Sequence, residues 1–369
     1  MKKYLFIALL LSLVISCNSD EGSDNNPEVF DNFDRRTILE NIADNIIIPT
    51  LQDFSSKMEV LTEKGQDFVS NPNQTSLDDI RSAWYEAYKT WQYVEMFNLG
   101  KAEELQYSSY INIYPLTVTD VENNISNGNY DLNSVDNQDA QGFPALDYLL
   151  YGKGANDTEI LETYISTNKD ASGYKQYLTD VLAQMTDLTT LVLSDWTSSY
   201  RDTFVSNSGN TTTSSLNELA NDFVFYYEKG LRTNKVGIPA GVFSANPLAD
   251  RVEALYREDI SKELLLLSLS AIQDVFSGKH YSSNEEGSSF DTYLTYLDRD
   301  DIVSNLNNQW NTARTQINTM SNSLYHQVLK DNSKMTDSYN ELQKAAVVLK
   351  VDMLQAFNIS VDYVDADGD

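Results

Sequence analysis

The spacing of apolar residues is the feature that most limits how this chain folds. Between Thr37 and Lys64, large apolar side chains recur every three to five positions, at Ile38, Ile42, Ile46, Leu51, Phe54, Met58 and Leu61. This period places them along one face of an α-helix. Pro49 predicts a kink or a restart within that helix.

Similar helical patterns follow along the rest of the chain, whereas strand patterns are scarce. The patterns cover residues 76–100, 172–203, 215–233, 248–277, 301–330 and 335–357. Helices that each bury one apolar face pack against one another in bundles. The sequence therefore predicts an all-α protein built from two bundles of about four helices each.

A polar stretch without periodicity separates the two predicted bundles. It reads "VSNSGNTTTSSLNE" and starts at Val205. Small polar residues of this kind mark loops and domain boundaries. We therefore assign residues 35–205 to a first helical bundle and residues 206–369 to a second. Residues 101–141 form a long, less regular connection, and long ordered connections are often functional.

The first seventeen residues, "MKKYLFIALLLSLVISC", have the pattern of an export signal. Two lysines precede an apolar run that is short for a membrane span, and the run ends at Ser16 and Cys17, the only cysteine of the chain. This pattern resembles a bacterial lipoprotein signal, in which the cysteine is lipidated and becomes the first residue of the mature chain. The alternative is an uncleaved anchor with a free thiol.

We therefore expect a signal peptide over residues 1–17 and a lipid anchor at Cys17. Residues 18–34 are polar and acidic, which predicts a tether rather than a packed segment. The expected location is the bacterial cell envelope, on the periplasmic or the surface-exposed face of the outer membrane. The lipid anchor would attach the protein to the membrane.

The charge of the chain excludes one class of partner. The formal net charge is −29, and binding to nucleic acid depends on cationic contacts to phosphates. We therefore expect no nucleic-acid partner. The sequence also contains no phosphate-binding loop, glycine-rich dinucleotide turn, G-x-S-x-G or HExxH motif.

One carboxylate extends a stripe of aromatic side chains. Trp84, Tyr88, Trp91 and Glu95 are spaced four, three and four apart, so they share a helical face. A carboxylate in such a place needs a partner, a metal ion or a shifted pKa. Glu95 either hydrogen-bonds at the end of the core or serves a cleft.

A second carboxylate, Asp147, lies within the otherwise apolar and aromatic run "QGFPALDYLLYG". We predict a short helix with Pro144 at its first position, where the missing N–H costs nothing. Asp147 then falls in the first turn, where the helix dipole favours negative charge. This arrangement explains Asp147 without any ligand.

Several segments resemble, in order, the signatures of the imelysin family. "GFPALDYLLYG" is similar to the family motif Gly-x-His-x-x-Glu with its following apolar helix, and the helix that holds Trp84, Trp91, Glu95, Phe97 and Gly100 resembles the first-domain signature. "NKVGIPAG" and "VEALY" resemble the second-domain signature. The resemblance extends from Ile38 to Asp369.

The resemblance implies two four-helix bundles related by internal duplication, with a site where they meet. It also implies a bacterial envelope protein of the kind often associated with iron uptake. Some members of the family are described as insulin-cleaving metallopeptidases.

The chain departs from the family motif at two positions. Gly142 holds the glycine, but Pro144 stands in place of the histidine and Asp147 in place of the glutamate. A zinc peptidase needs three protein ligands, usually including histidine, and a general base. The two histidines, His280 and His326, lie outside any such pattern. We therefore assign no catalytic residue, and the departure argues against an enzyme.

An all-carboxylate site remains as a hypothesis. Glu95 and Asp147 would be its metal ligands, and oxygen ligands of this kind suit iron or another divalent cation. The alternative is a buried hydrogen-bond network that joins the two bundles. The candidate inter-domain site consists of Trp91, Glu95, Gly142, Pro144, Asp147, Glu253 and Tyr256.

The function expected from the resemblance is non-catalytic binding in iron or haem uptake, with a partner protein of the outer membrane or of the uptake system. The first alternative is a metal-dependent peptidase of the imelysin type. The second is a structural interaction module, whose interface would show no pocket with convergent polar groups.

Overall fold

The computed structural model describes residues 31–166 and 170–361. Cys17, the signal segment and most of the acidic tether lie outside these ranges. Residues Asp34–Asp369 form one compact unit. Across the described ranges the secondary structure is helical, with a single isolated antiparallel bridge between Lys279 and Glu286. The predicted all-α class is confirmed.

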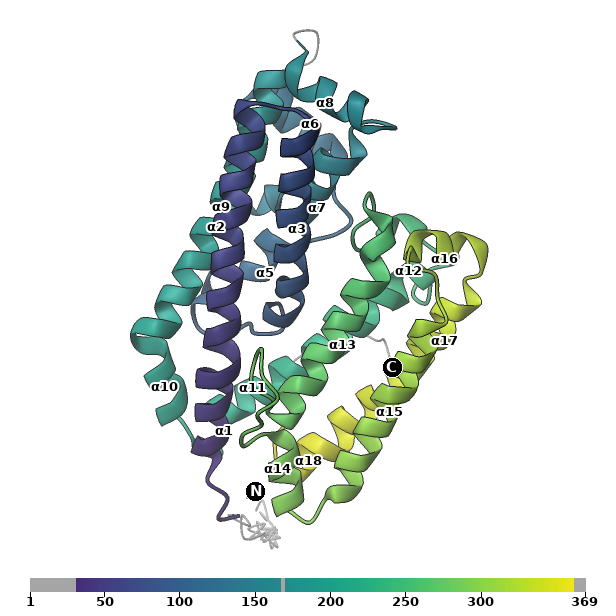
Figure 1. Ribbon diagram of the computed structural model, residues 1–369. Helices are drawn as coiled ribbons and strands as arrows, with labels where there is room; N and C mark the ends of the chain where they lie inside the picture. Colours follow the sequence, from purple (N-terminus) through teal and green to yellow (C-terminus); the bar gives the residue numbers. More distant parts are fainter. Residues whose placement is uncertain (1–30, 167–169, 362–369) are drawn as a thin grey trace, which may run out of the picture. The chain divides into compact units, whose positions relative to one another are not determined.

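Three long helices, α2 (Ile48–Ser70), α3 (Gln74–Val94) and α9 (Ala171–Asp195), pack side by side in the first half of the chain (Figure 1). Their shared core is aromatic, with the ring of Tyr88 stacked on that of Phe143 at 4.3 Å between centroids. The remaining elements of this half are α1 (Arg35–Asn41), η1 (Ile42–Ile47), α4 (Lys101–Glu104), α5 (Tyr107–Ile111), α6 (Val118–Asn127), η2 (Val135–Ala140), α7 (Gly142–Asp147), η3 (Tyr148–Gly152), α8 (Asp157–Ile165), η4 (Trp196–Tyr200) and α10 (Arg201–Ser206).

The second half packs four helical segments around Trp310, which is fully buried. They are α11 (Ser215–Phe225) with its continuation η5 (Tyr226–Gly237), α13 (Ser261–Ser277), α15 (Asp300–Asn318), and α17 (Ser333–Val347) with its continuation η8 (Val348–Met353). The shorter elements are α12 (Ile238–Ala240), η6 (Ala249–Arg251), η7 (Glu258–Ile260), α14 (Phe290–Tyr296), α16 (Leu324–Lys330) and α18 (Leu354–Ala356).

Pro49 lies at the start of α2, directly after the π-helical turn η1. The wider turn changes the hydrogen-bond register, so a new α-helical segment begins just before the proline. The proline has no N–H to donate, and the Asn45 carbonyl four residues before it accepts a hydrogen bond from the N–H of Tyr281 at 2.8 Å instead. The chain therefore continues from α1 into α2 without a break.

The helix expected over residues 248–277 begins only at Ser261. Before it, η6 and η7 flank a non-helical stretch, residues 252–257, in which Ala254 has a φ of +54°. This stretch, here called the docking segment, forms polar contacts with distant parts of the chain in place of helical hydrogen bonds. A second difference is that the helix expected over residues 301–330 divides into α15 and α16, and the Ser323 side chain caps the second.

Candidate functional site

The carboxylate of Asp147 holds the backbone of the docking segment. Its Oδ2 accepts a hydrogen bond from the N–H of Tyr256 at 2.8 Å, and its Oδ1 accepts one from the N–H of Arg257 at 2.9 Å. Burial raises the pKa of Asp147 to about 7, although the two amide hydrogen bonds act in the opposite direction. Both carboxylate oxygens therefore have partners within the chain.

The placement of Asp147 in a first helical turn was wrong. Helix α7 begins at Gly142, so Pro144 is its third residue and Asp147 its last. The missing N–H of Pro144 still costs little, because the first turn of a helix has free N–H groups. Asp147 is explained by the backbone of the docking segment and not by the dipole of its own helix.

Gly142 is required by close packing. Its φ is +73°, and a Cβ atom at this position would lie 2.1 Å from the carbonyl oxygen of Ile111. No side chain fits at that distance. The glycine therefore lets α7 approach the end of α5, the helix that precedes Asn112 and Tyr114.

Lys235, on η5, is the centre of a buried polar cluster. Its Nζ lies 2.7 Å from Glu253 Oε2, 2.8 Å from Gln92 Oε1 and 2.9 Å from Glu95 Oε1. These three oxygens match the three N–H donors of an ammonium group. Burial lowers the pKa of Lys235, but Glu253 and Glu95 outweigh burial and raise the pKa above its ordinary value. Lys235 therefore keeps its charge.

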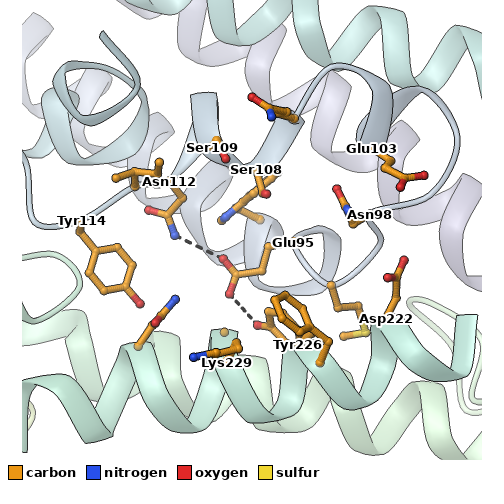
Figure 2. Close-up of a pocket in the computed structure, with 17 residues that line it drawn as sticks. Glu95, Asn98, Glu103, Ser108, Ser109, Asn112, Tyr114, Asp222, Tyr226 and Lys229 are labelled. Carbon is orange, nitrogen blue, oxygen red and sulfur yellow. Dashed lines mark hydrogen bonds between the residues drawn. The ribbon is translucent and has the colours of Figure 1, made fainter. Parts of the chain in front are cut away.

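Further hydrogen bonds extend the cluster. Asn112 Nδ2 donates to Glu253 at 2.8 Å. It also donates to Glu95 at 3.3 Å, and the Tyr226 hydroxyl donates to Glu95 at 2.5 Å (Figure 2). We call this set the Lys235 network; it consists of Gln92, Glu95, Asn112, Tyr226, Lys235 and Glu253. Its two carboxylates and one ammonium leave one negative charge, and it joins α3 and the residue after α5 to η5 and the docking segment.

A divalent metal ion at Glu95 and Asp147 does not fit these side chains. Asp147 is bound to two backbone N–H groups, and the oxygens of Glu95 face Lys235, Tyr226 and Asn112. Within residues 31–166 and 170–361, no three His, Cys, Asp or Glu side chains come together as a metal site. The Lys235 ammonium occupies the place between the two glutamates that a cation would take.

A pocket of about 680 Å³ lies beside the Lys235 network, and Glu95, Asn112 and Tyr226 belong to both. Figure 2 shows that its polar side chains come from the end of α3, from α4 and α5, and from α11 and η5. The polar and aromatic residues that line it include Trp91, Asn98, Glu103, Ser108, Ser109, Tyr114, Asp222, Lys229 and Asn234. The contact region between the two halves of the chain therefore contains a cavity with convergent polar groups.

The residues singled out in the sequence divide into two places. Glu95 and Glu253 meet at Lys235, and Trp91 lines the adjacent pocket. Asp147 and Tyr256 form a separate contact, in which the Tyr256 ring lies against that of Tyr148. Both places hold the docking segment.

The two histidines lie apart from these places. His280 Nδ1 is 3.5 Å from Glu285, and His326 Nε2 is 3.1 Å from Glu258. The His280 side chain is only 20% exposed, because the loop around it folds back on itself.

Sequence reasoning missed the central residue, Lys235, together with Gln92 and Asn112. A signal was present for Lys235, because a lysine directly before the apolar run of Val236 to Pro239 cannot easily reach water. Gln92 and Asn112 carried no comparable signal, because a neutral amide is ordinary at either position.

The imelysin family model matches residues 47–351. This span includes the whole Lys235 network. The chain belongs to the imelysin family.

Solved structures agree with this imelysin in fold. A candidate iron-regulated protein A precursor from Parabacteroides distasonis ATCC 8503 matches with a TM-score of 0.72 and 17% identity, over 88% of this chain and 95% of the other. An imelysin-like protein from Psychrobacter arcticum 273-4 matches with a TM-score of 0.68 and 15% identity, over 89% and 97%. No curated protein matches this chain. None of the helices in the described part of the imelysin has the length and apolar character needed to cross a bilayer.

Proposed function

We propose that this imelysin is a lipid-anchored component of the bacterial cell envelope that binds an iron complex or haem during iron uptake, without catalysing a reaction. The family and the fold support a role of this kind, and one structural neighbour carries the name of an iron-regulated protein. The anchor is proposed from the pattern of residues 1–17, with Cys17 as the lipidated residue.

The observation that carries the proposal is the contrast between two neighbouring places. At the family motif, Asp147 is engaged by backbone N–H groups, and Pro144 has no imidazole to offer. At the Lys235 network, the ammonium fills the space between the glutamates. Beside the Lys235 network lies a pocket lined by further polar side chains. The chemistry therefore favours binding over catalysis.

The pocket has the character of a small-molecule site. Its volume of about 680 Å³ falls within the usual range of roughly 300–1,000 Å³ for such sites. Tyr114 supplies aromatic surface, and Asn98, Ser108 and Asn234 supply hydrogen-bonding groups. An iron complex of several hundred daltons has both the size and the polarity to enter.

Calorimetric titration of the mature chain from Asn18 onward tests the proposal. We expect saturable binding of haem or of at least one iron(III) chelate. Ser108→Trp places an indole in the pocket and is expected to weaken binding by about tenfold or more. The control is Ser304→Trp, on an exposed site of α15 away from the pocket.

Two results would contradict the proposal. One is the absence of binding to haem and to every chelate tried. The other is equal affinity in the parent and in the Ser108→Trp variant, which would move the ligand out of the pocket. Metal-dependent cleavage of insulin by the purified chain would instead support the peptidase alternative.

A further inference from the structure

The pocket beside the Lys235 network carries an excess of negative charge. Glu103, on α4, and Asp222, on α11, line it, and Figure 2 draws both on the same side of the cavity. Lys229 is the one basic side chain among the described residues that line it. The Lys235 network adds one further negative charge behind Glu95. An anion entering the pocket would therefore meet net repulsion.

The carboxylates on this side of the pocket also raise the pKa of a neighbouring tyrosine. Burial and four carboxylates raise the pKa of Tyr200 to about 12; the carboxylates are Glu218, Glu103, Asp195 and Asp222. Two of these four line the pocket. Negative charge therefore extends from the cavity to the surface around Tyr200.

The aromatic lining provides a second, independent indication of the ligand. The rings of Tyr114 and Tyr226 line the pocket. Aromatic faces next to carboxylates are the combination that recognises organic cations.

The tyrosines of the pocket are poorly suited to bind iron directly. Burial, together with Glu253 and Glu95, raises the pKa of Tyr114 well above its ordinary value, and burial and Glu95 do the same for Tyr226. Ferric iron binds to a phenolate, and these neighbours oppose loss of the phenol proton. A ligand that brings its own iron-chelating groups is therefore favoured over bare iron.

From this arrangement we infer that the pocket recognises a ligand through a positively charged ammonium group, presented either by an iron chelate or by a free amine. The inference rests on the proposed function and narrows it. Of the ligands proposed above, it excludes haem, whose two propionates are negative. Glu103 and Asp222 attract the ammonium group, and the rings of Tyr114 and Tyr226 line the same pocket.

Matched chelates test the charge directly. The iron(III) complex of desferrioxamine B carries a free ammonium group, and its N-acetylated form carries a neutral amide in that place. Iron(III) citrate serves as the anionic probe and pentane-1,5-diamine as the iron-free amine. In calorimetric titrations of the mature chain, we expect the ammonium chelate to bind about tenfold more tightly than its acetylated form. Added salt should reduce this ratio.

A charge-neutralising variant supplies the structural control. Glu103→Gln combined with Asp222→Asn should bring the affinity ratio of the two chelates close to one. Glu59→Gln combined with Asp337→Asn removes two exposed carboxylates outside the pocket and should leave the ratio unchanged. Circular dichroism of each variant verifies that the helices are intact.

Each outcome decides between the alternatives. A preference for the ammonium chelate that the pocket variant abolishes supports the inference, and comparable binding of the diamine would identify a free amine as the source. Equal affinity for the two chelates, or tighter binding of the citrate complex or of haem, overturns the inference but leaves the proposed function standing. No binding of any probe, haem included, overturns both.

Discussion

The ammonium of Lys235 lies 2.7 Å from the carboxylate of Glu253, and each side chain is only 2% exposed. The pair joins η5 to the docking segment, and Glu95 and Gln92 extend it to α3. Burying charges is costly unless each is paired and hydrogen-bonded. Here both glutamates share the Lys235 ammonium and accept further hydrogen bonds, so the cluster fixes how these elements meet.

Removing the lysine should leave Glu95 and Glu253 buried without their shared counter-charge. We expect Lys235→Met to lower the free energy of unfolding by about 3–5 kcal/mol, as measured by urea denaturation. Lys229→Met, in the same helical segment but with no ion pair among the described residues, should change it by about 0.5 kcal/mol or less. A similar loss in both variants would show that the ion pairs of Lys235 do not contribute the predicted free energy of unfolding.

Combining Lys235→Met with Glu253→Gln tests whether the two residues act as a pair. The double variant removes one negative charge together with the positive one, so its stability loss should be smaller than the sum of the two single losses. We expect a coupling energy of about 1–3 kcal/mol from the double-mutant cycle. Strict additivity would contradict the pairing.

Gly142→Ala should destabilise the fold through a steric clash. The new Cβ would lie 2.1 Å from the Ile111 carbonyl oxygen at a φ of +73°, and we expect a loss of about 3 kcal/mol or more. Gly128→Ala is the matched control, because its φ is +62° and no atom lies within 4 Å of the added Cβ. It should cost about 1–2 kcal/mol. Equal losses in urea denaturation would contradict the packing argument.

Asp147 should make stability depend on pH. Its pKa in the folded chain, about 7, is above the value near 3.9 of an unfolded aspartate. The unfolded chain therefore loses its proton first as the pH rises, and the contribution of Asp147 to stability falls between about pH 4 and pH 7. Between these pH values, the unfolding free energy of the parent should fall relative to that of Asp147→Asn. A shift in the parent's favour would mean that the two amide hydrogen bonds outweigh burial.

Much of the helical architecture was accessible from the sequence because it depends on local periodicity. The apolar spacing after Thr37 reports directly on which faces can be buried. The docking segment could not be predicted in this way. Its conformation depends on Asp147 and Lys235, which are distant in sequence, and these contacts override a local preference for helix.

The candidate site was accessible only in part for the same reason. Glu95 and Asp147 stood out because each carboxylate interrupts an apolar pattern. The two were expected to share a site, but Asp147 binds backbone amides and Glu95 binds Lys235. Periodicity places a residue on a face, and it does not reveal which distant residue will face it.

The lipid anchor at Cys17 remains a prediction from the sequence. Expression of the full chain in a bacterium that processes lipoproteins should yield a product that begins at Cys17 and carries acyl chains, as read by mass spectrometry of the N-terminal peptide. The same product should partition into detergent. If a Cys17→Ser variant carried the same acyl mass increments and partitioned into detergent in the same way, lipidation at Cys17 would be contradicted.

The most direct test of the central claim is equilibrium dialysis of the mature chain against the iron(III) complex of desferrioxamine B. The account predicts that the chain retains one equivalent of iron together with its chelator, and that Ser108→Trp abolishes retention. Equal retention by both chains would contradict binding in the pocket. Iron retained without its chelator would instead show that side chains of the protein bind the metal directly. That result would contradict the conclusion that the Lys235 ammonium takes the place of a cation between the two glutamates.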